Sequence, residues 1–564
     1  MAKPTRYTPE LIEKYYKEGW WDPRTSGDIW DENARNFPEE ECLVDSRVRL
    51  TWSRAKQWID RLALGFLRMG LEKDEMLVVQ LPNSAELFTL RVACEKAGIL
   101  CLPVLAAFRH KEMEYLLRQM GAAGVVIPGQ FRNFDHFEMI HEIRSTLPSL
   151  RHVFVTGDDV PAGSVALAGM LEHPLEDQYP SGYLDGKKCP PTDFSLVLST
   201  SGSTGFPKFV EYPSCSQLRA GRNKIELLNF TQADVFGAFA PGIGPNIPVI
   251  YGAPQVAAKV VMMEKFDAEG AFHLIDREKI TVAFVVPAML AKMLIHPGIK
   301  RSDLGSLRLI YCTGAALNYE LGLEVEEKMG CSVVQFYGSV DGGAATGHRW
   351  NEPLKVRLSS VGKPVGGNEV MLADENGRQV PEGKDGEVFM RGPSFVSGYY
   401  RDPEATRKVW TEDGWYKTGD LGRFDGQGNL VIVGRKTDCI IRGGQNIYPA
   451  EVEKILATHP VVSEVAIIGM PDPVMGERAC AYVVPVRGKH LTFEEMVSFL
   501  KRNNIASFKL PERLELIEKL PMVSEGQKLD RVALQKDIIR KLKERVQGVK
   551  DSRGRADSER TTNT

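Results

Sequence analysis

A segment rich in hydroxyl groups and glycine, residues 199–208, has the composition of a phosphate-binding loop. It has the sequence STSGSTGFPK and follows an apolar strand predicted over residues 194–199. Glycine lets the backbone turn tightly and bring its N–H groups against phosphate oxygens, hydroxyls donate to the same oxygens, and Lys208 adds a positive charge. A flexible Ser/Gly linker, the structural alternative, would require neither the preceding strand nor the Pro-Lys that follows. The segment lacks the GxxxxGK(S/T) pattern, which disfavours a P-loop kinase or ATPase.

The elements predicted around this loop are those of an α/β protein. Short apolar runs with strand character alternate with amphipathic helical patterns over most of the chain, and residues 54–67 form one such pattern. Continuous apolar strands that alternate with helices predict mostly parallel sheets covered on both faces. The predicted strands lie at residues 77–81, 124–127, 194–199, 283–286 and 309–311.

The pattern changes along the chain. A Gly/Pro-rich stretch over residues 156–191 predicts a connection between two α/β units. From about residue 362, shorter strands and Asn-Gly or Asp-Gly turns predict a small antiparallel or barrel-like unit. A compact α+β domain is predicted from helices at 449–457 and 492–502 and strands at 465–468 and 481–484. The polar, aperiodic residues 551–564 predict a frayed tail.

Composition restricts the class of protein. The 564 residues favour three or four structural units, and 43% hydrophobic with 26% charged residues excludes a disordered chain. A formal charge of −3 argues against a dedicated nucleic-acid binder. No run approaches the ~20 consecutive apolar residues of a membrane span, and the start, MAKPTRYTPELIEKYY, lacks the apolar block of a signal peptide. The nine cysteines form no CxxC pair, which predicts reduced thiols in a cytoplasm and no structural zinc. We expect a soluble cytoplasmic enzyme.

The loop STSGSTGFPK resembles the signature loop of the adenylate-forming superfamily, which includes acyl- and aryl-CoA synthetases, adenylation domains of peptide synthetases and luciferases. Further motifs follow in the family's order over nearly the whole chain. The resemblance implies a large N-terminal domain over residues 1–436, with two α/β sheet subdomains and a small β-barrel-like one, at roughly 1–190, 191–360 and 361–436. It also implies a small, mobile α+β domain over 437–546, and a flexible tail is expected over 547–564.

The resemblance implies an ATP site with Mg²⁺. Residues 335–342, QFYGSVDG, resemble the adenine and magnesium segment, in which Tyr337 would stack on adenine and Asp341 would hold Mg²⁺. The family usually has Thr and Glu where this chain has Val340 and Asp341. A small-residue turn along the adenine face is implied at 313–317. The ATP-binding residues implied so far are Thr200, Ser201, Gly202, Ser203, Thr204, Gly205, Lys208, Gly314, Ala315, Ala316, Phe336, Tyr337 and Gly338, with Thr204 and Asp341 also catalytic.

Residues 415–420, WYKTGD, resemble the segment whose aspartate binds both ribose hydroxyls, here Asp420, and Arg435 would also contact the ribose. A plain turn is the structural alternative for Asp420. The hinge between the two domains is implied at 436–438, with Thr437 where the family commonly has Asp or Lys. Gly443 and Gly444 resemble the glycines presented to the pantetheine arm of CoA, and the start of a helix is the structural reading of that segment.

The family's catalytic lysine follows a proline, a short polar loop and a glycine. Here residues 521–531, PMVSEGQKLDR, carry one extra residue, Gln527, between the glycine and the lysine. Alignment on the Leu-Asp-Arg at 529–531 selects Lys528, which would also contact ATP. A plain surface lysine is the alternative.

The segment at 239–248, FAPGIGPNIP, is expected to line the acyl pocket, and its first half resembles benzoate-type CoA ligases. Residues 15–22 and 79–86 and the carboxy-terminal region instead resemble dihydroxybenzoate-activating enzymes of siderophore synthesis. Those enzymes carry His-Asn-Tyr where this chain has Pro-Gly-Ile at 241–243, and a phenolic hydroxyl requires a polar partner. We therefore expect an apolar ring, benzoate-like or alicyclic such as cyclohexanecarboxylate, with medium chains still open. The expected wall residues are Phe239, Gly242, Ile243, Gly314 and Val340, each of which core packing would explain as well.

Three functions remain from the sequence. The first is a Mg²⁺- and ATP-dependent carboxylate–CoA ligase, with ATP and CoA as co-substrates. The second is a stand-alone adenylating enzyme that loads an acyl group onto the phosphopantetheine of a carrier protein. The third is a non-enzymatic nucleotide-binding protein, which the residues Val340 and Asp341 and the extra Gln527 would permit. We expect a monomer or homodimer without nucleic-acid partners or a membrane span.

Overall fold

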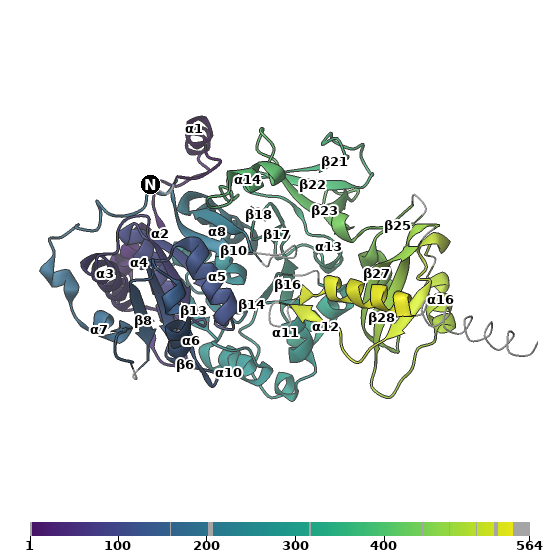
Figure 1. Cartoon of the computed structure of the whole chain (residues 1–564), viewed down its shortest axis with the longest axis horizontal. Coiled ribbons are helices and arrows are strands. Elements are labelled where there is room, and N and C mark those ends of the chain that lie inside the picture. Colours follow the sequence, from purple (N-terminus) through teal and green to yellow (C-terminus); the bar gives the residue numbers. More distant parts are fainter. Residues whose placement is uncertain are drawn as a thin grey trace, which may run out of the picture. The chain divides into compact units, whose positions relative to one another are not determined.

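The computed structural model describes residues 3–157, 160–200, 207–314, 317–442, 445–472, 474–503, 505–523 and 528–544. The chain forms two compact units. The first contains residues 1–371, 389–418 and 426–430, and the second contains 372–388, 419–425 and 431–564. The predicted mixed α/β fold with largely parallel sheets is confirmed (Figure 1).

The first unit contains a seven-stranded sheet with the strand order β11-β10-β4-β3-β5-β8-β9. Its strands are parallel except for the antiparallel pair β10 and β11. The five residues of each of β3, β4 and β5 are buried, as expected of strands covered on both faces. The strands are β3 (Met76–Gln80), β4 (Leu100–Val104), β5 (Gly124–Pro128), β8 (His152–Thr156), β9 (Val165–Ala166), β10 (Phe194–Ser199) and β11 (Phe209–Pro213).

The helices of this part begin at side chains that cap their free N–H groups. Thr51 accepts from the Arg54 amide at the start of α3, and Ser84 accepts from the Leu87 amide at the start of α4. The two helices pack against each other (Figure 1). The helices are α1 (Pro9–Lys17), α2 (Ser26–Asn36), α3 (Trp52–Arg68), α4 (Ala85–Ala97), α5 (His110–Met120), α6 (His136–Ile143) and α7 (Leu167–Glu172).

A second seven-stranded sheet of the first unit has the order β16-β15-β14-β12-β13-β1-β2, and β1 and β2 are its antiparallel pair. A large buried cluster of apolar side chains packs between its strands and α10, α11 and α12. The strands are β1 (Glu41–Val44), β2 (Arg49–Thr51), β12 (Val235–Ala238), β13 (Lys259–Met262), β14 (Val282–Val285), β15 (Leu309–Cys312) and β16 (Ser332–Gln335). The helices are α8 (Ser214–Leu228), α9 (Ile247–Gly252), α10 (Ala268–Glu278), α11 (Pro287–Leu294), α12 (Tyr319–Met329) and α13 (Leu354–Ser359).

The division of the strands between these two sheets does not follow the order of the chain. β1 and β2 come early in the chain but belong to the second sheet, whereas β10 and β11 follow the predicted connection at 156–191 and belong to the first. That stretch also contains β9 and α7, and β9 extends the first sheet at its edge. Each of the two sheets therefore contains strands from before and from after residue 190.

Short strand pairs and a separate four-stranded sheet complete this part, but the strands of that sheet have five to nine residues, so the predicted shorter strands after about residue 362 are wrong for it. The short antiparallel pairs are β6 (Gln130–Phe131) with β7 (Phe134–Asp135), β17 (Gly338–Ser339) with β18 (Gly343–Ala344), and β19 (Thr346–Gly347) with β20 (Lys363–Pro364). A four-stranded sheet has the order β21 (Glu369–Ala373), β22 (Gly386–Arg391), β23 (Tyr416–Phe424) and β24 (Leu430–Arg435). Helix α14 (Pro403–Val409) lies in the sequence between β22 and β23.

The second unit contains a five-stranded sheet built on a long antiparallel hairpin, β27 (Val462–Asp472) and β28 (Gly476–Pro485). β29 (Arg513–Leu516) runs parallel to β28, and β25 (Ile440–Arg442) joins the other end of β28. One face of the hairpin packs on α15 (Pro449–Leu456) and α16 (Phe493–Arg502), so the predicted α+β character is confirmed. The remaining strands are β26 (Gln445–Ile447), β30 (Met522–Val523) and β31 (Lys528–Leu529).

Candidate active site

The predicted phosphate loop connects two strands that pair with each other. Ser199 at the end of β10 lies opposite Phe209 at the start of β11. At the base of the loop, the Thr200 amide donates to the Lys208 carbonyl at 2.9 Å, and the Lys208 amide donates to Oγ1 of Thr200 at 3.1 Å. These bonds close the base of the loop. The predicted phosphate ligands Ser201, Gly202, Ser203, Thr204 and Gly205 lie outside the described residues.

Lys208 and Asp341 both contact Tyr399. The Lys208 ammonium lies 4.6 Å from the centroid of the Tyr399 ring, and the Tyr399 hydroxyl donates to Oδ2 of Asp341 at 2.9 Å. The backbone at Tyr399 and Tyr400 runs along β11, where the Tyr400 amide donates to the Phe209 carbonyl at 2.7 Å. Burial raises the pKa of Tyr399 and the Asp341 carboxylate raises it further, so the hydroxyl stays protonated and remains a donor. The structure therefore brings together two predicted site residues that are far apart in the sequence.

Two other tyrosines position the segment that carries Asp341. The Tyr212 hydroxyl, on β11, donates to the backbone carbonyl of Val340. Tyr416 lies so close to Gly342 that a Cβ at Gly342 would be 2.4 Å from Cε1 of the ring. Burial raises the pKa of Tyr212 well above its ordinary value, which keeps its donor proton in place. The turn between β17 and β18 is thus fixed from β11 and from β23.

The aromatic residues before this turn differ in their surroundings. Phe336 is buried and stacks on Tyr311 of β15, with ring centroids 4.8 Å apart and an interplanar angle of 17°. Tyr337 is half-buried and Gly338 is exposed. Gly314, two residues after the end of β15, is also exposed and has a φ of +87°, which favours glycine, whereas Ala315 and Ala316 lie outside the described residues.

The expected acyl-pocket segment is held by two buried asparagines. Asn83 accepts from the Gly242 amide at 3.0 Å and donates to the Ala240 carbonyl at 2.8 Å. Asn246 donates to the Ala240 and Gly242 carbonyls, each at 2.7 Å. These bonds fix a loop in which Gly242 has a φ of +79°.

The expected wall residues differ in how much of each is exposed. A Cβ at Gly244 would lie 3.8 Å from Cγ2 of Val340, so the pocket segment lies beside the Asp341 turn. Ile243 is 4% exposed, and the ring of Phe239 is 1% exposed within the core cluster of the second sheet. Val340 and Gly242 are half-buried, which leaves part of each accessible.

In the second unit, Asp420 and Arg435 are paired. Nε of Arg435 lies 2.8 Å from Oδ1 of Asp420, and the carboxylate is mostly buried while the guanidinium is half exposed. Their neighbour Lys436 starts a short 3₁₀ turn, Lys436–Asp438, and pairs with Glu387 at 2.9 Å. The structure thus joins the two residues predicted to contact the ribose.

Other predicted residues of this unit are only partly described. Gly443 and Gly444 lie outside the described residues. Lys528 begins β31, which pairs with β30 so that Lys528 lies opposite Val523. Residues 524–527, including Gln527, also lie outside the described part of the chain.

Asp341 has the chemistry of a magnesium ligand. Its carboxylate is half-buried, and in the described part of the chain no cationic side chain forms an ion pair with it. The Tyr399 bond engages Oδ2 and leaves Oδ1 as a hard oxygen donor. Across the described residues, no group of three or more His, Cys, Asp or Glu side chains could hold a metal by itself. Asp341 therefore fits an ion whose remaining ligands would be phosphate oxygens and water.

Sequence analysis did not single out Tyr399, Tyr212 or Asn83. These residues act through contacts with segments more than 50 positions away, and a single tyrosine or asparagine has no spacing pattern that would reveal such contacts.

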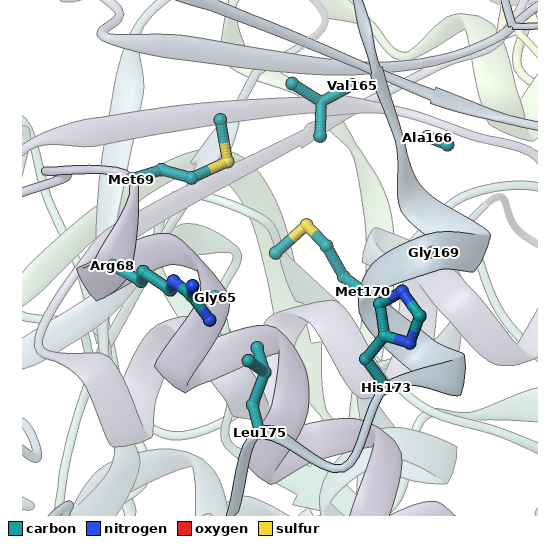
Figure 2. Close-up of a pocket in the computed structure, with 9 residues that line it drawn as sticks. All are labelled: Gly65, Arg68, Met69, Val165, Ala166, Gly169, Met170, His173 and Leu175. Carbon is teal, nitrogen blue, oxygen red and sulfur yellow. The ribbon is translucent and has the colours of Figure 1, made fainter. Parts of the chain in front are cut away.

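An open, largely apolar cavity of about 230 Å³ lies elsewhere in the first unit, between α3 and the β9–α7 segment (Figure 2). Met69 and Met170 point into it, and His173 lies at its side. β9 is at the opposite edge of the first sheet from β11, so this cavity is not part of the Lys208 and Asp341 site.

Comparisons with known proteins establish the family. The chain matches the sequence profile of the AMP-binding enzyme family over residues 30–400 and that of the AMP-binding enzyme C-terminal domain over 451–527. The chain therefore belongs to the AMP-binding enzyme family. The predicted adenylate-forming superfamily and the predicted class, an AMP-forming acid–thiol ligase, are confirmed.

Two relatives match almost end to end. The 2-hydroxy-7-methoxy-5-methyl-1-naphthoate–CoA ligase of Streptomyces carzinostaticus is 34% identical, over 94% of this chain and 97% of that protein. The 2,3-dihydroxybenzoate-AMP ligase of Bacillus subtilis is 30% identical, over 95% of this chain and 98% of that protein. Among solved structures, an anthranilate CoA ligase in complex with anthranoyl-AMP superposes with a TM-score of 0.82 at 23% identity, over 91% of this chain and 97% of that one, which shows the shared fold.

In the described residues, no helix combines the length and the apolar character that a bilayer crossing requires.

Proposed function

We propose that the chain is an ATP-dependent carboxylate–CoA ligase that acts on a cyclic carboxylic acid, aromatic or alicyclic. The end-to-end match to a naphthoate–CoA ligase carries this proposal. The convergence of Lys208 and Asp341 on Tyr399 supports it, because one tyrosine then contacts both a cation at the base of a phosphate-type loop and a carboxylate that could hold a metal ion.

The first half-reaction would join the acid to AMP. A carboxylate oxygen attacks the α-phosphorus of ATP, a P–O bond forms, and the bond to the leaving pyrophosphate breaks. Negative charge gathers on the phosphate oxygens in the transition state, so the contribution of the protein is positioning and electrostatic stabilisation. We assign Lys208 and the loop hydroxyls to the phosphates. Asp341 would hold Mg²⁺, which neutralises phosphate charge when it is bound.

Tyr399 would orient the Asp341 carboxylate. Its hydroxyl occupies one oxygen, and the ring contacts the Lys208 ammonium, so one side chain fixes the relative position of both charged groups. Asp420 would accept hydrogen bonds from the ribose hydroxyls, and Arg435 would hold that carboxylate in place.

The second half-reaction would transfer the acyl group to a thiol. The sulfur attacks the carbonyl carbon of the acyl-adenylate, AMP leaves with the bridging oxygen, and the thiol proton passes to solvent. We propose a hinge at residues 436–438, a mobile domain over 437–546 with Lys528 as the catalytic lysine of the first step, and Gly443 and Gly444 along the pantetheine arm. The separate C-terminal family match at 451–527 supports this division.

A stand-alone adenylating enzyme that loads a carrier protein is the second candidate. The end-to-end match to 2,3-dihydroxybenzoate-AMP ligase favours it. Both candidates share the first half-reaction and differ only in the thiol acceptor. Either reaction fits a cytoplasmic location, which the free thiols of all nine cysteines also favour.

The decisive experiment combines acids with thiol acceptors. Benzoate, cyclohexanecarboxylate and octanoate are each incubated with ATP, Mg²⁺ and the full chain, and AMP and pyrophosphate release are measured. CoA should raise turnover and yield a thioester that is detectable by mass spectrometry. If CoA has no effect while a phosphopantetheinylated carrier protein becomes acylated, the second candidate replaces the first. Absence of acid-dependent pyrophosphate exchange in a panel extended to hydroxylated and dicarboxylic ring acids would contradict both.

A further inference from the structure

Lys224 is a buried lysine in the middle of α8. Its side chain is 3% exposed, although lysine is among the residue types least often buried. Among the described residues, no hydrogen bond or ion pair engages its ammonium group. The nearest acid along the helix, Glu226, is bound instead by Arg219 at 3.0 Å and by Arg222 at 3.3 Å. Desolvation lowers the pKa of Lys224 to about 8, and Arg219 lowers it in the same direction.

A second buried lysine of the same unit shows how the fold normally accommodates such a charge. Lys96 lies 2.9 Å from Asp31 and also pairs with Asp60, so two carboxylates neutralise it. Lys224 has no such pair. A buried charge without a partner destabilises the folded chain, and a methionine of similar length would avoid that cost. The arrangement is explained if a group that is not part of the protein supplies the missing partner.

Lys224 and its helix contact elements that adjoin the candidate acyl site. Its ammonium lies 5.1 Å from the ring centroid of Phe336, four positions before the expected wall residue Val340. Helix α8 also packs closely on α9, because a Cβ at Gly221 would lie 2.6 Å from the Tyr251 carbonyl. α9 begins within the pocket segment at 239–248 and continues it. Helix α8 therefore contacts both the segment that carries the expected wall residue Val340 and the helix that continues the pocket segment.

We infer that Lys224 determines substrate specificity by binding a second, acidic or hydrogen-bonding oxygen on the ring of the acid, remote from the carboxylate that is adenylated. This inference rests on the proposed function. The residues at 241–243, Pro-Gly-Ile, provide no polar side chain for such an oxygen, whereas Lys224 provides three N–H donors and a positive charge. The substrate class becomes a ring acid with a carboxylate or hydroxyl substituent, in place of a wholly apolar ring.

The inference predicts how the enzyme ranks simple acids. Benzoate is compared with 3-hydroxybenzoate, 4-hydroxybenzoate, isophthalate and terephthalate by acid-dependent pyrophosphate exchange with the full chain. The wild type should prefer the best oxygen-bearing acid over benzoate by at least about tenfold in kcat/KM, because a site with a buried polar group rejects an analogue that leaves it unpaired. Lys224→Met should reduce that ratio by at least about tenfold and leave the KM for ATP unchanged. Lys224→Arg should retain part of the preference, since the charge remains.

Arg222→Met is the matched control, because Arg222 is half exposed on the same helix and its loss should leave the ranking unchanged. A ranking that Lys224→Met does not alter would overturn the inference. If Lys224→Met lowers kcat/KM equally for all acids, or raises the KM for ATP, the inference is also overturned. Such a result would indicate a structural or nucleotide-binding role for Lys224.

A binding assay separates this inference from the proposed reaction. Thermal shifts are measured with isophthalate, terephthalate and the two hydroxybenzoates in the absence of ATP, for the wild type and for Lys224→Met, each against benzoate. A shift that is specific to an oxygen-bearing acid and lost in Lys224→Met supports the Lys224 site even if no acid is adenylated. If acids are adenylated but neither the ranking nor the shifts depend on Lys224, the proposed function stands and this inference fails. If no acid shifts the wild type and none is exchanged, both fail.

Discussion

The Tyr399 hydroxyl donates a hydrogen bond to Oδ2 of Asp341 at 2.9 Å, and the same ring lies 4.6 Å from the Lys208 ammonium. Tyr399 is 1% exposed, so its position is fixed by packing and by the backbone bonds of its neighbour to β11. A rigid, buried donor can orient a carboxylate without a loss of conformational freedom at the moment of reaction. We assign Tyr399 as a positioning residue for both charged groups.

Tyr399→Phe should weaken the use of Mg²⁺. The variant keeps the ring that contacts the Lys208 ammonium but removes the hydroxyl that donates to Oδ2 of Asp341. The carboxylate is therefore oriented less well. We expect the Mg²⁺ concentration for half-maximal pyrophosphate exchange to rise several-fold, and the free energy of unfolding to fall by about 1 kcal/mol for one lost hydrogen bond. Tyr400→Phe, at the adjacent buried tyrosine, is the control. An unchanged Mg²⁺ dependence in Tyr399→Phe would exclude the positioning role.

Asp420→Ala should impair recognition of the ribose. Removal of the carboxylate eliminates two hydrogen-bond acceptors and the ion pair with Arg435. We expect the KM for ATP to rise by about tenfold or more. Discrimination against 2′-deoxy-ATP should fall, because the variant can no longer bind the 2′-hydroxyl of the ribose. Asp385→Ala is a matched control, since it breaks an ion pair with Arg423 in the same unit. A KM for ATP that equals the wild-type value would remove Asp420 from the nucleotide site.

Local patterns predicted individual elements well. The predicted strand at 194–199 is β10, and the predicted helix at 54–67 is α3, because continuous burial and helical periodicity leave clear signals in nearby residues. The distribution of strands between the two sheets could not be predicted. β10 pairs with β4 and β1 pairs with β13, and such long-range pairings depend on the packing of the whole unit rather than on any local pattern.

The residues of the candidate site also divide into those that a local sequence pattern predicts and those that depend on the folded structure. Lys208, Asp341, Asp420 and Arg435 were found because they occur in motifs with a characteristic order. Tyr399 and Lys224 were not found, because the importance of each depends on what surrounds it in three dimensions: a distant carboxylate for Tyr399 and the absence of one among the described residues for Lys224. Burial and pairing are properties of the folded chain, which a single sequence does not reveal.

Lys528→Ala should separate the two half-reactions. If Lys528 stabilises the transition state of adenylation, its loss should lower acid-dependent pyrophosphate exchange by about 100-fold or more. Thioester formation from a supplied acyl-adenylate and CoA should change little, because that step does not form the bond to phosphorus. Lys536→Ala, at an exposed lysine nearby in the sequence, should leave both rates unchanged. Equal losses in both half-reactions would contradict the assignment of Lys528 to the first step.

Lys224 should make the stability of the chain depend on pH in the alkaline range. Its pKa is about 8 in the folded chain against an ordinary value of 10.5, so between these pH values the unfolded chain binds more protons than the folded one. Stability from this group therefore rises as the pH increases from 8 to 10.5. Below pH 8 the side chain is charged in both states, and the full cost of the buried charge remains.

Lys224→Met removes that titration. The variant should be more stable than the wild type at pH 7, and the difference in the free energy of unfolding should shrink by up to about 3 kcal/mol as the pH approaches 10.5. Urea unfolding of both proteins at several pH values measures this difference, and alkaline effects that are common to both cancel. Arg222→Met should show a difference that does not vary with pH, because arginine stays charged throughout. If the difference in the free energy of unfolding for Lys224→Met stays constant with pH, Lys224 titrates as an ordinary exposed lysine. The description of Lys224 as a buried, unpaired charge would then be wrong.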